Sequence, residues 1–475
     1  MNRRRAAAWC ALACGSTAPA RAVAFDAEVR AETYAQAYQI RGPAGSPVIS
    51  SRRVSQTISV GLVERPRDPH GVTVIFRARL RFDADFGEAC DAVTNRCLDE
   101  TNRTRPDQFV PIYGQRTMDL AYGYLDILNI GRAADVRLGR MFQTDALGFF
   151  VFDGARARVH IGPWMIAEAL AGLETRAGFI ASDGRFERDG LIRADRGAWD
   201  PSLTPYVLNR SLAPVVGFAA ESPQAFPVYA RLVYRRVWAA EGVAEEKIGA
   251  TIDAPIIPTL RVYGDAAWSI PQQALTIANA SLEWHRRGFR VALDYQRWRP
   301  SFDLASIWVA FWTDPTDMLQ ARTEIPLTRG LSLTANALVR RYALSESGPS
   351  TNGPALPDEY NAGGGGSLVL RTPGYQASLR GTFEGGAVGL RAGFDAAAAW
   401  WVWADLVRLD ARLSMWQVED QLRPDRSGIS FGGVVGASVR LGPIAELHTD
   451  IEDDINRFVG HRFRAMAILA VRGVL

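Results

Sequence analysis

The chain has 475 residues and a formal net charge of +3; 48% of its residues are hydrophobic, 22% charged and 10% aromatic. The aromatic content excludes a disordered chain, and apolar runs of at most nine residues exclude a helical membrane protein, whose helices need about 20. Four arginines lie in the first 24 residues, which contain no acid, so the remainder has a formal charge of −1. We therefore expect no nucleic-acid partner.

The first 24 residues have the pattern of a secretory signal peptide. Three consecutive arginines begin at Arg3, residues 6–14 form a short apolar stretch, and residues 22–24 (Ala-Val-Ala) form a small-x-small cleavage site. We expect cleavage after Ala24, which divides the chain into a signal peptide, residues 1–24, and an exported part, residues 25–475.

Residues 72–86 show the clearest β-strand pattern, with apolar residues at every second position. The alternate positions carry Arg77, Arg79, Arg81, Asp83 and Asp85. Successive strand side chains point to opposite faces, so this strand has one face suited to lipid and one suited to water. The pattern recurs along the whole exported part, and many of the segments exceed the five or six residues typical of a globular strand.

Cys90 and Cys97 are the only cysteines left after cleavage, and the segment between them is polar. A disulfide between them is expected in an oxidising compartment. Metal binding is the alternative, but no histidine and no second cysteine pair lies nearby, so we expect no metal site.

Short glycine- and proline-containing turns alternate with longer polar loops. The turns are residues 131–135, 162–163, 286–288, 328–330, 372–374 and 441–443, and the loops are residues 87–113, 177–212, 299–317, 344–362 and 421–428. Short turns on one rim and long loops on the other are typical of outer-membrane barrels. An unpaired backbone group in hydrocarbon is costly, so every strand must pair. We predict an all-β fold: a single closed antiparallel transmembrane β-barrel of about 22 strands, within a range of roughly 18 to 24.

Two stretches resemble known proteins. Leu138-Gly-Arg-Met-Phe142, followed by Phe152-Asp-Gly-Ala-Arg-Ala-Arg158, resembles a hairpin of porin-like outer-membrane proteins of Gram-negative bacteria. Residues 454–464 are similar to the closing hairpin of uncharacterised barrel proteins from the same bacteria. The resemblance implies an integral protein of the bacterial outer membrane with a channel-type function, although fold alone does not fix function.

Further arginines alternate with apolar neighbours: Arg156, Arg158, Arg231, Arg235 and Arg290. An arginine on the lipid face costs about 2–4 kcal/mol at the midplane, so we expect these residues and the charged face of residues 72–86 to line the pore. Arginine and carboxylate rows would sort solutes by charge, which favours small polar solutes such as anions or sugars. The alternative is that they only brace the wall through ion pairs. We expect loop 177–212 to fold inward and narrow the pore.

Trp400, Trp401 and Trp403 are expected to form part of an aromatic girdle at the membrane interface, where amphipathic rings are favoured. The outer-membrane location implies contact with lipid and lipopolysaccharide and insertion by the barrel-assembly machinery. The oligomeric state is left open.

Two other functions compete with a passive channel. One is a structural barrel, or the barrel of an export complex, without pore activity. The other is an outer-membrane hydrolase, for which Ser438, His448 and Asp450 are the only cluster that suggests a triad, without a Gly-x-Ser-x-Gly motif. The acidic segment 448–454 lacks the glycine-spaced pattern of a Ca²⁺ loop, so a solvated loop is preferred. We therefore expect no enzymatic activity, no cofactor and no metal.

Overall fold

The computed structural model describes most of the exported part of the chain. The described residues are 25–41, 47–64, 71–85, 88–89, 118–175, 213–223, 226–239, 242–299, 315–346, 357–403, 406–421, 427–456 and 460–474. The predicted signal peptide, the Cys90–Cys97 disulfide and the predicted constriction by loop 177–212 lie outside these residues, as do the side chains of Asp83 and Asp85. None of the helices in the described residues is long and apolar enough to cross a membrane.

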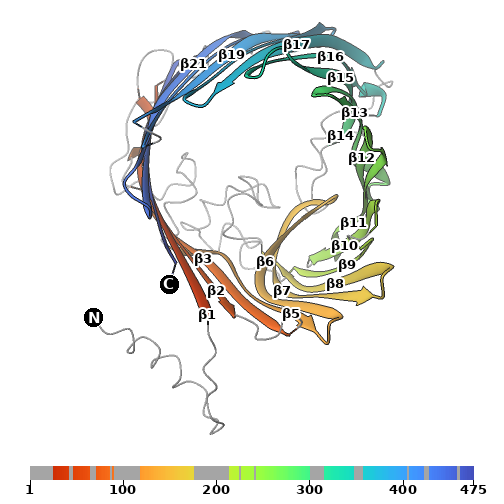
Figure 1. The fold of residues 1–475 in the computed structure, drawn as a ribbon. Helices are drawn as coiled ribbons and strands as arrows, with labels where there is room; N and C mark the ends of the chain where they lie inside the picture. The colour runs from red at the N-terminus through yellow and green to blue at the C-terminus, as the bar shows by residue number, and fades with distance from the viewer. Residues whose placement is uncertain are drawn as a thin grey trace, which may run out of the picture.

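The described residues form one sheet rolled into a ring (Figure 1). The first half of the ring contains β1 (Phe25–Arg41), β2 (Pro47–Glu64), β3 (Thr73–Asp85), β4 (Glu88–Ala89), β5 (Met118–Ile130), β6 (Ala134–Asp145), β7 (Gly148–Ile161), β8 (Met165–Glu174), β9 (Pro214–Glu221), β10 (Tyr229–Ala239) and β11 (Gly242–Ile257). The second half contains β12 (Leu260–Ser269), β13 (Ala274–Arg286), β14 (Phe289–Trp298), β15 (Thr316–Pro326), β16 (Leu331–Tyr342), the short 3-10 helix η6 (Leu344–Glu346), β17 (Glu359–Thr372), β18 (Tyr375–Gly386), β19 (Gly389–Val402), β20 (Val407–Asp420), β21 (Gly428–Arg440), β22 (Ala445–Asn456) and β23 (Gly460–Val474).

The first and last strands close the ring. β23 pairs antiparallel with β1 from Glu28↔Val474 to Arg41↔His461. The two-residue strand β4 pairs only with residues 49 and 50 near the start of β2. The other 22 strands form the closed barrel. The predicted single closed antiparallel barrel is therefore confirmed. Closure leaves no open sheet edge, which is the condition for a sheet in hydrocarbon.

One rim of the barrel carries short turns and the other carries the long connections, as the turn pattern predicts. The exception is that some short connections also occur on the second rim. β1 begins and β23 ends at the same rim, and all six predicted short turns join strands there. In the turn between β5 and β6, Gly131 and Arg132 have φ values of 59° and 65°, which glycine adopts without strain but arginine rarely adopts. The opposite rim carries the long connections, but two-residue connections, such as those between β6 and β7 and between β18 and β19, also occur there.

The hairpin formed by β6 and β7 arches into the ring (Figure 1) and identifies the inner face of the sheet. Its turn residue Leu147 lies so close to β11 that a Cβ added at Gly249 would be 2.7 Å from the Leu147 Cδ2 atom. Residues paired across neighbouring strands share a face, so the register extends this assignment around the ring. The opposite face carries exposed apolar side chains, including Phe218, Leu232 and Leu319, and forms an outer belt suited to lipid.

The buried apolar clusters of the described residues lie between the hairpin and the inner wall. The first contains Tyr124, Met141, Phe150, Phe152, Leu170, Ala213, Val215, Val237 and Ala244, and the second contains Ala146, Leu147, Ala219, Val233 and Ala267. The hairpin is thus packed against the wall from β8 to β12 by apolar contacts, and the site described next is built around it.

Candidate functional site

The hairpin can bend inward because its upper half leaves the sheet. β5 pairs with β6 only as far as Gly123↔Arg140, and β7 pairs with β8 only as far as Phe152↔Glu174. Residues 141–151 therefore lie outside the β5–β6 and β7–β8 pairing, and this part of the hairpin turns into the lumen.

Glycines mark the level at which the hairpin bends. A Cβ on Gly139, Gly154 or Gly172 would lie less than 3.0 Å from a backbone atom of the neighbouring strand, and Gly139 has a φ of 123°. Only glycine allows strands to approach so closely. Gly139 and Gly154 belong to the two motifs that resemble the porin hairpin, so those motifs coincide with the bend.

Arg235 on β10 holds the tip of the hairpin. Its guanidinium lies 4.3 Å from the centre of the Phe150 ring and donates to the Leu147 carbonyl at 3.5 Å. The same group bonds Glu245 on β11 at 2.7 Å, and Lys247, the only lysine in the chain, bonds the other oxygen of Glu245 at 3.0 Å. This contact joins the tip to strands about 90 residues further along the chain.

Beneath the hairpin, two arginines and two glutamates form a buried, charge-balanced network. Arg231 on β10 lies 2.9 Å from Glu168 on β8 and also bonds Glu221 on β9. Arg158 on β7 lies 3.5 Å from Glu168 and also bonds Glu221. The Glu168 side chain is only 3% exposed, so removing one arginine would leave a buried charge.

Two inner-face arginines, on β7 and β3, have no partner among the described residues. Arg156 on β7 is paired in register with Arg137, which bonds Asp126 at 2.5 and 2.9 Å and lies over the Tyr124 ring at 4.2 Å. Neither Arg156 nor Arg77, which is paired in register with Tyr124, makes a hydrogen bond or ion pair with any described residue.

Of the other predicted pore residues, Arg79, Arg81 and Arg290 also lie on the inner face by register. Arg79 bonds Glu32 on β1 at 2.9 Å, and Arg290 bonds Glu283 on β13. Arg81 has its own interactions on this face. The ion pairs of Arg79 and Arg290 fit the bracing interpretation, and solute binding stays a prediction. Their role in lining a pore stays a prediction.

Sequence reasoning missed the acids that neutralise these arginines. Glu168, Glu221 and Glu245 were not singled out, although Glu168 stands between apolar residues at alternate positions of β8. The alternation could have placed Glu168 on the inner face, but the sequence does not indicate which arginine it meets.

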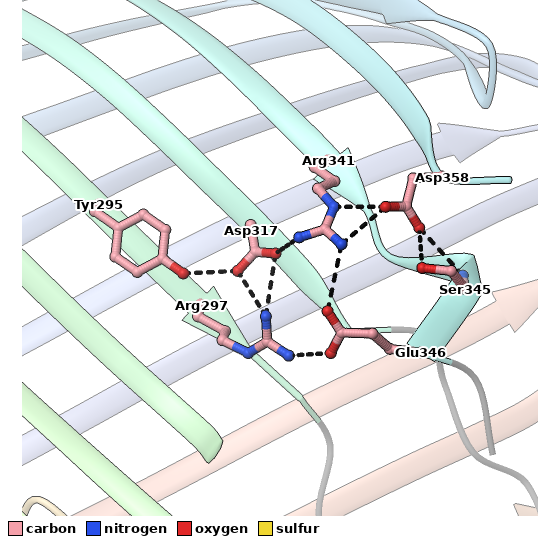
Figure 2. Close-up of polar contacts among 7 residues, drawn as sticks. All are labelled: Tyr295, Arg297, Asp317, Arg341, Ser345, Glu346 and Asp358. Atoms are coloured by element: carbon pink, nitrogen blue, oxygen red, sulfur yellow. Dashed lines mark hydrogen bonds and ion pairs between the residues drawn. The ribbon is translucent and has the colours of Figure 1, made fainter. Parts of the chain in front are cut away.

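A second polar cluster lies on the outer face, at the rim opposite the termini (Figure 2). Arg341 on β16 bonds Asp317 at 3.1 Å, Asp358 at 2.8 Å and Glu346 at 3.3 Å. Arg297 on β14 lies 3.2 Å from Asp317 and also bonds Glu346. These ion pairs hold η6 and the residue that precedes β17 against β14, β15 and β16.

The outer position of this cluster follows from its neighbours on the same strands. Leu319 and Val339 lie two residues from Asp317 and Arg341, and Leu293 lies four residues from Arg297; all three are exposed on the lipid face. Tyr295 donates its hydroxyl to Asp317 at 2.8 Å and marks the end of the apolar belt. The cluster is therefore a rim feature outside the lumen.

The Ser345 hydroxyl and backbone N–H donate to Asp358 at 2.6 and 3.1 Å. Together with the adjacent Arg341 guanidinium, these bonds hold the pKa of the Asp358 carboxyl below its usual range.

On the inner face of β21 and β22, away from the hairpin, the structure brings together Ser438, His448 and Asp450. Ser438 Oγ is 2.8 Å from His448 Nδ1, and His448 Nε2 is 2.8 Å from Asp450 Oδ2. The remaining acids of segment 448–454 have different partners: Glu452 and Asp454 bond Arg462, and Glu452 also bonds Arg464.

Of the tryptophans predicted to form a girdle, Trp400 lies on the outer face and Trp401 does not, and the girdle position of Trp400 stays a prediction. Trp400 is 54% exposed on the outer face. Trp401 instead points inward, where Arg408 lies 5.2 Å from its ring centre, because neighbouring strand residues face opposite sides.

No protein-family model and no curated protein matches the chain. Among solved structures it is similar to OccAB3 of Acinetobacter baumannii, with 10% identity and a TM-score of 0.44 over 95% of this chain and 99% of that one. OpdK of Pseudomonas aeruginosa, solved with vanillate, gives the same four values. A BenF-like porin from Pseudomonas fluorescens Pf-5 has 9% identity and a TM-score of 0.46 over 95% of this chain and 99% of that one. The barrel assignment rests on the strand pairing described above.

Proposed function

We propose that the protein is a passive channel of the bacterial outer membrane for small polar solutes, with a preference for anions. The closed ring, the apolar outer belt and the charged inner wall support this function. The observation that carries the anion preference is the pair of inner-face guanidiniums, Arg77 and Arg156, that are not neutralised by any described residue.

The anion preference follows from how the other charges are balanced. Arg137 is bonded to Asp126, and Arg158 and Arg231 are bonded to Glu168 and Glu221. These ion pairs brace the wall, whereas Arg156 adds an uncompensated positive charge directly below the hairpin. A positive group in a confined aqueous passage concentrates anions and repels cations. We therefore propose anions, rather than sugars, as the favoured solutes.

The narrowest part of the proposed passage is at the β6–β7 hairpin. Loop 177–212 is proposed to contribute to it, because its two ends lie beside the hairpin. The Thr175 backbone N–H donates to the Val151 carbonyl at 2.9 Å, and the Glu174 N–H donates to the Ala213 carbonyl at 2.8 Å. Deleting most of the loop between these ends should raise the single-channel conductance, and an unchanged conductance would contradict its role.

Channel activity is tested by swelling of liposomes that contain the purified protein. Swelling in small polar solutes supports the channel, whereas tight vesicles support a structural or export-complex barrel. Charge selectivity is tested by the reversal potential of a planar bilayer in a KCl gradient. Arg156→Gln should shift it towards cation selectivity, whereas Arg156→Lys, which keeps the positive charge, should leave it near the wild-type value. Equal shifts would contradict the role of Arg156.

Export and partners belong to the same proposal. We propose cleavage after Ala24, a Cys90–Cys97 disulfide formed outside the cytoplasm, insertion by the barrel-assembly machinery, and contact of the outer belt with lipid and lipopolysaccharide. The intact mass of the protein purified from membranes, before and after reduction and alkylation, tests both the cleavage and the disulfide. A mass that retains residues 1–24, or alkylation without reduction, would contradict them.

A further inference from the structure

We propose that Ser438, His448 and Asp450 form a hydrolytic site on the inner wall that cleaves small carboxylic esters. This site lies on β21 and β22, away from the hairpin, and the proposal does not depend on the channel function. It assigns a chemical activity to a cluster that has no role in the ion-pair networks described above.

The strand register positions the three side chains. Ser438 and His448 are a directly paired couple across β21 and β22, and Asp450 lies two residues along β22 from His448. All three therefore lie on the inner face. The hydrogen-bond chain runs from the Ser438 hydroxyl through the His448 ring to the Asp450 carboxylate, with both distances at 2.8 Å. A nucleophile, a base and a group that orients the base are thus in contact.

A glycine opposite Asp450 makes this geometry possible. Gly436 is the register partner of Asp450, and a Cβ at Gly436 would lie less than 3.0 Å from Asp450 Oδ1. The carboxylate lies flat against the wall in the space that a side chain would occupy. The Asp450 side chain is consequently 18% exposed, while that of His448 is 32% exposed and accessible from the lumen.

The hydrogen bonds fix the proton on the ring. An ionised carboxylate only accepts hydrogen bonds, so the His448 Nε2 atom must donate to Asp450. In the neutral ring Nδ1 is then the acceptor, and it faces the Ser438 hydroxyl. The two nitrogens have the reverse order from that in the familiar serine hydrolases, but the roles of base and orienting group are the same.

In this proposal, the oxyanion is stabilised by two arginines that lie near Ser438 in the strand register. The backbone N–H groups of β21 and β22 pair within the sheet, so the strand offers no backbone oxyanion hole. Arg408 is the register partner of Ser438 on β20, and Arg440 lies two residues along β21, both on the inner face. Arg408 is held in place by Asp410 at 2.7 Å and by the Trp401 ring. Preorganised charge at this position stabilises the tetrahedral intermediate.

The reaction needs only the ester and water as reactants. Ser438 Oγ adds to the ester carbonyl carbon as its proton passes to His448 Nδ1. The bond to the alcohol oxygen breaks, and the alcohol leaves with that proton, which leaves an acyl-serine. Water then adds to the acyl carbon and gives a proton to Nδ1. The bond to Ser438 Oγ breaks, the serine regains the proton, and the carboxylic acid is released.

The test uses the full-length folded protein in detergent, with p-nitrophenyl acetate as the substrate and a fluorophosphonate as the covalent probe. We expect hydrolysis above that of the buffer and a probe adduct located on Ser438 by peptide mass spectrometry. Ser438→Ala should abolish both. Asp450→Asn should lower both at least tenfold, because the orienting charge is lost while the shape is kept.

Ser430→Ala is the matched control, since Ser430 lies on the inner face of the same strand and is paired with Asn456 instead of a histidine. It should leave hydrolysis and labelling unchanged. Heat-modifiable mobility on gels verifies that each variant is folded. The proposal is overturned if folded wild-type protein is not labelled at Ser438, or if Ser438→Ala hydrolyses the ester as fast as the wild type.

Discussion

Gly154 and Gly172 face one another across β7 and β8 at the level where the hairpin turns inward. Each occupies space in which a side chain would strike the backbone of the other strand. The sequence marks Gly154 through the motif that resembles a porin hairpin, but not the reason for it. That reason is the inward bend, which depends on contacts made far from the motif.

Gly154→Ala should destabilise the barrel by about 1–3 kcal/mol or more, because the added methyl group must push β7 and β8 apart. Urea unfolding in detergent, followed by tryptophan fluorescence, measures the loss. Gly381→Ala on β18 is the control, since a Cβ there meets no atom within 4 Å. Equal stabilities of the two variants would show that the strands at the bend are not closely packed.

Arg235 is the residue on which the hairpin position most depends. Arg235→Ala removes the contact with Phe150, the bond to the Leu147 carbonyl and the ion pair with Glu245. A hydrogen bond to a charged group contributes about 1.5–3 kcal/mol, so the tip should detach part of the time. We expect a higher single-channel conductance with more open-channel noise. Arg261→Ala, which removes a pair with Asp253 far from the hairpin, should change neither; a quiet, unchanged Arg235→Ala channel would exclude the anchoring role.

At the scale of elements, the strands were predictable and the hairpin was not. Alternation and turn residues identify β6 and β7, because both follow from local sterics and the separation of lipid from water. The connection at residues 146–147 is a short turn like several others. It folds inward because Leu147 fits against Gly249 and Arg235 reaches Phe150, and these pairs are about 100 and 85 residues apart in sequence. The same limit applies to Arg158, whose inner position was predictable but whose glutamate partners were not.

The connection between β16 and β17 is fastened by the outer-face cluster (Figure 2), and its stability should depend on pH. The pKa of Asp358 is lowered in the folded state, so its contribution is present above the usual aspartate pKa of about 4 and is lost as the pH falls through the lower folded value. Ser345→Ala removes the hydroxyl that contributes most, and should shift this loss to higher pH. Pepsin cleavage within residues 343–358, followed between pH 2 and 5, measures it. Identical pH profiles for the variant and the wild type would contradict the role of Ser345.

For the molecule as a whole, closure with both ends at the same rim requires an even number of strands. The number itself, about 22, comes from counting the segments between the turns and loops. Alternation cannot show which residues of the first and last strands meet, since a slip by two residues keeps every side chain on its face. Only the pairing of β1 with β23 defines the seam.

The seam can be tested by cysteine cross-linking in a chain with Cys90→Ser and Cys97→Ser. Ala35 on β1 is paired with Ala467 on β23, so Ala35→Cys with Ala467→Cys places two thiols on adjacent strands of the outer face. Oxidation should join β1 and β23 by a disulfide. After a single proteolytic cut in a loop, the two fragments should then separate on a gel only under reducing conditions. Ala35→Cys with Val471→Cys moves the second thiol four residues along the strand, about 13 Å away, and should not cross-link. Cross-linking of the second pair instead of the first would place the seam in another register.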